Sequence, residues 1–179
     1  MTKTRLITLD GLSPGTYRYL PAEHSLAVFE QGDHHAGLTV GTLDAAWLKG
    51  CPLILILSAD LTAADRAFEV QETGRGERFC WFEAGLVSQN IYLWAAENGF
   101  GTVFLGGLDY AKTRSATERW MPASHTVLGM LPFGYPAGLS ASSPVNRQWT
   151  AGVPSLVILV GLMTHPVEFH KLRIRGRLR

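Results

Sequence analysis

An apolar stretch from Phe79 to Asn98 constrains the fold more than any other part of this chain, because its periodicity predicts one long helix. Apolar side chains occupy more than one face of that helix, which indicates near-complete burial. In a chain of 179 residues, a helix buried on all sides is often covered by a second subunit. Gly99 follows at the position where a left-handed residue commonly ends a helix.

Strand and helix patterns alternate irregularly on both sides of this helix. Pro52 to Ala59 is a continuous apolar run, which predicts a central strand with both faces buried. A helix is predicted from Asp33 towards Trp47, and a polar connector begins at Asp60. Strands mixed with helices, without a regular βαβ rhythm, predict an α+β fold with a mixed central sheet. The other predicted elements are a hairpin of strands at 16–20 and 25–29, a strand at 102–105, a helix at 109–120, a strand at 126–133 and a buried strand at 153–163.

Composition limits the classes of function. A hydrophobic content of 46% and a charged content of 17% suit one globular domain with a sizeable core. The net charge of +1 gives no field that would favour nucleic acid or a membrane surface, and no apolar run approaches the length of a membrane span. With no signal peptide and no CxxC pair, the chain is expected in the cytoplasm, with the thiols of Cys51 and Cys80 in the core.

Motifs of the common enzyme classes are missing from the sequence. Gly99 and Gly101 leave a helix and open a strand, which is the reverse of the order in a dinucleotide-binding fingerprint. No hydrolase motif is present. The adjacent residues Asp33, His34 and His35 do not converge on one helix face, so no metal site is predicted.

The pair Gly106-Gly107 allows two interpretations. In the first, it forms a tight strand-to-helix turn whose backbone only glycine tolerates. In the second, the missing side chains let a flat ring approach the backbone, whose N–H groups can then bond it. The sequence leaves both interpretations open.

Four segments carry a resemblance to a known family. Their order and spacing resemble the FMN-dependent nitroreductase family from Leu6 to Pro136, and most closely its SagB-type branch, whose members oxidise azoline rings in modified peptides. The segments are GLSPGTYRYLPAEHSL from Gly11, EAGLVSQNIYLWAAENGFGT from Glu83, FLGGLD from Phe104 and LGMLPFGYP from Leu128.

The resemblance implies an assembly, a cofactor and a site. Two subunits would interlock through long helices, as a homodimer or as a heteromer with a related subunit, with FMN in a cleft at each interface. Leu105, Gly106 and Gly107 would lie against the flavin ring, and Arg147 would bind the FMN phosphate. The resemblance further implies hydride transfer through flavin N5 to or from a small-molecule or peptide-derived ring. The catalytic residue stays unassigned.

The sequence departs from the family pattern at its N-terminus. Family members carry an arginine- and serine-rich phosphate-binding motif before the hairpin, where this sequence has only Met1 to Asp10. We therefore expect a nitroreductase-like domain at 1–152 that is incomplete at its N-terminus, and a C-terminal extension at 153–179 that can wrap a partner subunit. A split enzyme, a fragment and a degenerate relative are three explanations. The alternative function is that of a flavin-free partner subunit or pseudoenzyme scaffold, since a phosphate without its arginines loses charge-assisted hydrogen bonds.

Overall fold

The computed structural model describes residues 12–23, 25–43, 48, 50–134 and 156–161. Within these residues, six strands form one mixed sheet in the order β2-β1-β6-β3-β5-β4. Strand β6 is parallel to both of its neighbours, whereas β1 with β2, β3 with β5 and β4 with β5 are antiparallel pairs. The predicted α+β class is confirmed. The strands are β1 (Gly15–Leu20), β2 (Ser25–Gln31), β3 (Leu53–Ala59), β4 (Gly101–Thr102), β5 (Thr126–Gly134) and β6 (Leu156–Gly161).

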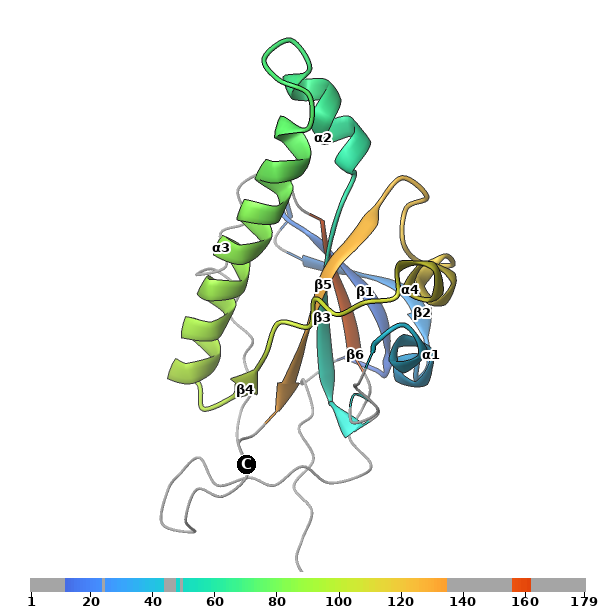
Figure 1. Cartoon of the computed structure of the whole chain (residues 1–179). Coiled ribbons are helices and arrows are strands. Elements are labelled where there is room, and N and C mark those ends of the chain that lie inside the picture. The colour runs from blue at the N-terminus through green and yellow to red at the C-terminus, as the bar shows by residue number, and fades with distance from the viewer. Residues whose placement is uncertain (1–11, 24, 44–47, 49, 135–155, 162–179) are drawn as a thin grey trace, which may run out of the picture.

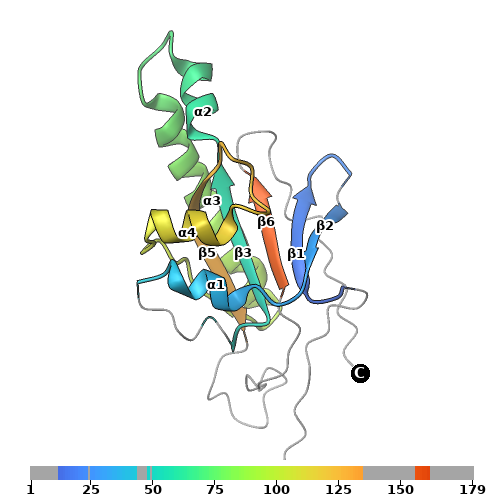
Figure 2. The same ribbon diagram turned by 90° about the vertical axis from the view of Figure 1, so that its right-hand side faces the viewer.

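Helices cover both faces of the sheet (Figure 1, Figure 2). The long helix α3 (Arg75–Glu97) crosses one face, while the short helices α1 (His35–Val40) and α4 (Tyr110–Thr117) cover the other. Successive side chains of β3 point alternately into the two cores, which lie on opposite faces of the sheet. All seven residues of β3 are buried, so the prediction of a strand with both faces buried is confirmed.

The N-terminal hairpin is also confirmed, since β1 pairs with β2 in antiparallel register. The helix predicted from Asp33 is present as α1, but it ends at Val40 rather than continuing towards Trp47. Gly41 follows it and packs so closely against α4 that a Cβ atom there would overlap the side chain of Thr113. This contact fixes the end of α1 against the start of α4.

A second short helix, α2 (Leu61–Phe68), occupies the segment for which the sequence predicts a polar connector, and that prediction is wrong. The side chain of Asp60 accepts a hydrogen bond from the Ala63 N–H group at 2.8 Å and so caps the helix. Figure 1 shows that α2 and the first turns of α3 project beyond one end of the sheet. The two helices touch at Gly76, where a Cβ atom would overlap the carbonyl group of Ala64.

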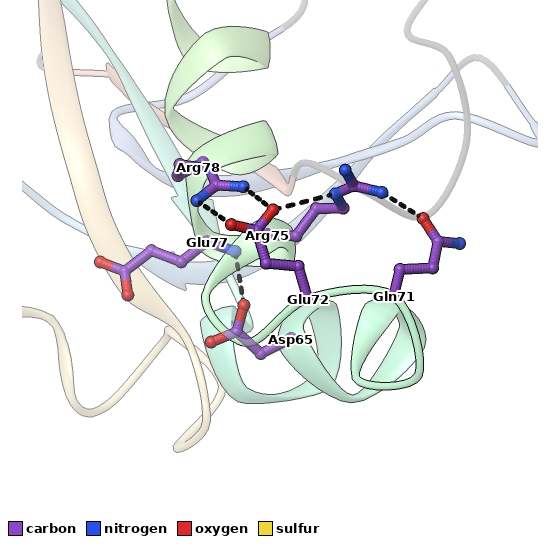
Figure 3. A network of polar contacts seen from close by, with 6 residues as sticks. All are labelled: Asp65, Gln71, Glu72, Arg75, Glu77 and Arg78. Atoms are coloured by element: carbon purple, nitrogen blue, oxygen red, sulfur yellow. Dashed lines mark hydrogen bonds and ion pairs between the residues drawn. The ribbon is translucent and has the colours of Figure 1, made fainter.

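Polar contacts surround the turn between α2 and α3 (Figure 3). Glu72 forms ion pairs with both Arg75 and Arg78. The N–H group of Glu77, in the first turn of α3, donates to the Asp65 carboxylate at 2.8 Å. The ion pairs are exposed and contribute little each, so the glycine contact and this capping bond define how the helices meet.

Helix α3 begins at Arg75, one turn before the predicted start, and ends at Glu97, with Gly99 following in the predicted left-handed conformation at a φ of 74°. The prediction of near-complete burial is wrong for the single chain. One face of α3 packs on the sheet. The opposite face exposes between 37% and 67% of four large apolar side chains: Phe79, Phe82, Leu86 and Leu93.

The strand predicted at 126–133 is present as β5, whereas the predicted strands on either side of it in the sequence differ in length or position. The strand predicted at 102–105 is shorter, because β4 stops at Thr102 and pairing resumes only at Leu105, opposite Met130. The strand predicted at 153–163 is present as β6 and lies in the middle of the sheet, between β1 and β3. At 156–161, the segment assigned to a C-terminal extension is therefore part of this chain's own sheet.

Candidate functional site

The candidate site is the turn that carries the chain from β4 to α4. In Figure 1 the chain leaves the lower end of α3 and forms β4, and the turn then passes across to α4 on the other side of the sheet. Leu105 exchanges two backbone hydrogen bonds with Met130 of β5, at 2.8 and 3.1 Å. Both backbone groups of Leu105 are therefore engaged, and the residue anchors the turn to the edge of the sheet.

The far side of the turn is anchored to the segment after α1. The N–H group of Leu43 donates to the Gly107 carbonyl at 3.1 Å, and the N–H group of Asp109 donates to the Gly41 carbonyl at 2.8 Å. The side chain of Asp109 then caps α4 by accepting from the Lys112 N–H group. The turn is thus fixed at both ends by backbone hydrogen bonds.

The structure decides between the two interpretations of the glycine pair only in part. Neither Gly106 nor Gly107 has a φ in the left-handed region, so backbone conformation does not require glycine at either position. A Cβ atom on Gly107 would meet only Leu43 Cδ1, at an ordinary 3.7 Å. A Cβ atom on Gly106 would lie 3.1 Å from the Phe104 ring, which is a closer contact. The interpretation that only glycine tolerates this backbone is therefore wrong.

Both glycines are exposed and present bare backbone to solvent. The Gly106 carbonyl accepts from Leu108 and the Gly107 carbonyl accepts from Leu43. Among the described residues, the N–H groups of Gly106 and Gly107 have no acceptor. The turn therefore offers two adjacent N–H donors on a surface without side chains, which suits a flat ligand that carries hydrogen-bond acceptors.

Of the remaining predicted site residues, Arg147 lies outside the residues that the structure describes. No catalytic residue is predicted from the sequence, and the turn itself carries no titratable side chain between Leu105 and Leu108. The structure brings Leu105, Gly106 and Gly107 together with one side chain that sequence reasoning missed. This is Tyr92 of α3, whose hydroxyl accepts a hydrogen bond from the Phe104 N–H group at 2.7 Å.

The exposed apolar side chains of α3 form the second feature of interest. Phe79, Phe82, Leu86 and Leu93 recur at three-, four- and seven-residue spacings and so share one helix face, which we call the α3 stripe. The sheet-facing side of the same helix carries small or branched residues such as Ala84. An exposed apolar row on a long helix is typical of a surface that another chain covers.

The two cysteines are buried, as predicted. Burial raises the pKa of Cys51 to about 12 and, with nearby acidic groups, the pKa of Cys80 to about 11. Both thiols are therefore protonated at neutral pH and are poor nucleophiles. Both side chains contribute to core packing and have no catalytic role.

A serine and a histidine meet at one end of the sheet, although no motif marks them. Ser58 Oγ of β3 lies 3.1 Å from His125 Nδ1, and the Asp60 carboxylate attracts the same histidine. Burial lowers the pKa of His125 more than Asp60 raises it. Ser58 is only 2% exposed, so its hydroxyl is not accessible to a substrate. The pair joins β3 to the residue before β5, close to the register shift between the two strands.

His35 is buried, and its Nδ1 atom lies 3.1 Å from Asp33 Oδ1. Burial lowers the pKa of His35 despite this carboxylate, which favours a neutral ring. Within the described residues, no group of three histidine, cysteine, aspartate or glutamate side chains is arranged to hold a metal ion. No helix in the described part of the chain is both long and apolar enough to cross a membrane.

Comparison with known proteins covers the part of the chain that contains the turn and the α3 stripe. The family model described as "Nitroreductase family" matches residues 3–135. A Methanocaldococcus jannaschii protein named "Putative nitroreductase MJ1384" is 31% identical over 96 residues, which make up 54% of this chain and 46% of that protein. The aligned part therefore spans about half the length of that curated relative.

Proposed function

The chain belongs to the nitroreductase family, and from this premise we propose that it is a flavin-dependent oxidoreductase whose cofactor is FMN. The observation that carries the proposal is the exposed Gly106-Gly107 turn, with two N–H groups that have no acceptor among the described residues. The turn lies inside the part of the chain that the family model matches.

The chemistry of the turn fits a flavin ring. An isoalloxazine is flat and carries carbonyl oxygens and ring nitrogens that accept hydrogen bonds along its edge. Glycines allow such a ring to approach the backbone, and the Gly106 and Gly107 N–H groups are available to donate to it. Because Leu105 is held by Met130, the turn does not have to order itself when a ligand binds, and this lowers the cost of binding.

Bound FMN supplies hydride transfer, while the protein binds and orients the ring and tunes its electron affinity. N–H donors that point at the ring stabilise negative charge, so the glycine pair would favour the reduced form. We further propose that Arg147 binds the phosphate, since a guanidinium matches phosphate oxygens with paired hydrogen bonds.

The SagB-type resemblance supports a substrate class. We propose an azoline or a similar small ring within a peptide, which loses a hydride and a proton to become aromatic while the flavin is reduced. The supporting residues are the hairpin from Gly11 and the helix segment from Glu83 that resemble this branch. We place this reaction in the cytoplasm, where both buried thiols remain reduced.

A second subunit is part of the proposal. The α3 stripe is too apolar to stay in water at no cost, and a homodimer or a heteromer with a related subunit would bury it. In either assembly, a long helix of one chain packs against its counterpart.

The test is a visible absorption spectrum of the purified chain, before and after incubation with FMN and gel filtration. Co-elution of FMN at a ratio near one per chain supports the proposal. Absence of co-eluting flavin from folded protein contradicts it and favours the alternative, a flavin-free partner subunit or pseudoenzyme scaffold.

A matched pair of variants locates the site. Gly107→Val is expected to abolish FMN retention and to preserve the fold, because a Cβ atom there meets only Leu43 at an ordinary distance. The control is Gly50→Val, at another exposed glycine where a Cβ atom meets nothing within 4 Å. Equal FMN content in Gly107→Val and wild type would exclude the turn as the site.

A further inference from the structure

We propose that Tyr92 positions the Gly106-Gly107 turn for its cofactor. This inference rests on the proposed function, because it assigns a role within the same site. Tyr92 lies on α3, and its hydroxyl oxygen accepts the hydrogen bond of the Phe104 N–H group at 2.7 Å. Phe104 precedes the glycine pair by two residues, so Tyr92 connects the long helix directly to the turn.

The Phe104 N–H group needs this acceptor because the sheet does not provide one. The N–H and carbonyl groups of Leu105 both point at Met130 of β5, so the N–H group of the adjacent Phe104 points away from β5, on the side where β4 is the last strand of the described sheet. The residue is half-buried, and an amide in that position loses stability when it has no partner. The Tyr92 hydroxyl accepts from this N–H group on the side that faces no strand of the described sheet.

The side chain of Phe104 transmits this constraint to the glycines. Its ring lies over Gly129 of β5, where a Cβ atom would overlap the ring. The same ring lies 3.1 Å from the position of a Cβ atom on Gly106. Phe104 is therefore held at its amide by Tyr92 and at its ring by the surface of β5. A shift of the amide or of the ring of Phe104 would move the backbone of Gly106.

The hydroxyl of Tyr92 has no other role among the described residues, where its hydrogen has no acceptor. A phenylalanine would fill the same space next to the sheet without accepting the Phe104 bond. The packing of Tyr92 and its hydrogen bond can therefore be separated by one substitution, Tyr92→Phe.

The control is Tyr17→Phe. Tyr17 lies on β1, and its hydroxyl donates to the Ser13 carbonyl at 2.7 Å, so the change removes a comparable hydroxyl–backbone bond away from the turn. Three quantities are measured on wild type and both variants: amide hydrogen exchange at Phe104 without FMN, the FMN dissociation constant, and the reduction potential of bound flavin.

In Tyr92→Phe, amide exchange at Phe104 should be about tenfold faster and FMN binding about tenfold weaker, which corresponds to the loss of one hydrogen bond. The potential of the bound flavin should become more negative, because less well-fixed N–H donors stabilise the reduced ring less. Tyr17→Phe should change none of the three, even where it lowers the melting temperature.

The outcomes separate this inference from the proposed function. Unchanged exchange at Phe104 in Tyr92→Phe overturns the inference, whether or not the protein binds flavin. Faster exchange with wild-type FMN affinity and potential also overturns it, because Tyr92 would then order the turn without serving the cofactor. Wild-type protein that binds no FMN overturns the proposed function and this role with it, while the exchange data still report whether Tyr92 holds the turn.

Discussion

Replacing Leu86 with glutamate tests whether the α3 stripe is a subunit interface. Leu86 lies on the outward face of α3 between Phe82 and Leu93, and 67% of it is exposed in the single chain. The substitution removes no core contact of the monomer, because the buried face of the helix is on the opposite side. The fold should therefore persist while the stripe acquires a charge at its centre.

The expected effect follows from the exposed fraction. Full burial of a leucine side chain contributes roughly 2 kcal/mol, so burying the exposed two-thirds on association contributes about 1.3 kcal/mol. In a twofold dimer the residue is present once in each subunit, which doubles the loss to about 2.7 kcal/mol. The dimer dissociation constant should rise about 100-fold, and more where the glutamate loses its water.

Sedimentation velocity over a concentration series measures this shift. The control is Val70→Glu, which adds the same charge at a residue that is 90% exposed in the turn between α2 and α3, away from the stripe. We expect wild type and Val70→Glu to dimerise alike and Leu86→Glu to sediment as a monomer. Identical association of the Leu86 variant and wild type would refute the interface.

Three further predictions concern stability and reactivity. Burial lowers the pKa of His35 and His125 below the usual 6.5, so the unfolded chain binds protons at a higher pH than the folded chain does. The urea concentration at the unfolding midpoint should therefore decrease as the pH is lowered from about 7 to about 5. A midpoint that does not change with pH would contradict neutral, buried rings. Cys51 and Cys80 should resist a thiol reagent at about pH 8 until urea unfolds the chain, because their pKa values lie at about 12 and about 11. Gly76→Val should destabilise the fold by about 1–3 kcal/mol through overpacking between α2 and α3, and an unchanged melting temperature would disprove the contact.

The sequence patterns predict those elements whose side chains are buried by the chain's own core. Pro52 to Ala59 is apolar except at Ser58 because helices cover both faces of the sheet, and this pattern requires no knowledge of what covers them. Helix α2 is only eight residues long and mixes apolar with charged side chains, so its periodicity is weak, and its stability depends on the Asp60 cap and on contact with Gly76. Apolar residues around α3 predict burial, but periodicity does not distinguish a side chain packed in its own core from one that another chain would cover.

The Gly106-Gly107 turn is visible in the sequence, but the contacts that hold it are not. A glycine pair after a strand is visible in the sequence, and so is its place in the family pattern. The acceptor for Phe104 is 12 residues upstream on a helix, and the surface for its ring is Gly129 on a neighbouring strand. Neither contact has a characteristic spacing, because both arise only when α3, the turn and β5 are brought together in three dimensions.

A binding surface made of backbone alone requires support from elsewhere, since glycine contributes no side chain to fix its own position. Here the support comes from both directions along the chain: Met130 and Tyr92 hold the segment before the glycines, and Leu43 holds the carbonyl of Gly107. These contacts leave the two glycine N–H groups as the part of the turn without an acceptor among the described residues. An arrangement that satisfies the carbonyls and leaves adjacent donors exposed costs little in water, and it makes the donors available to a ring that can replace that water.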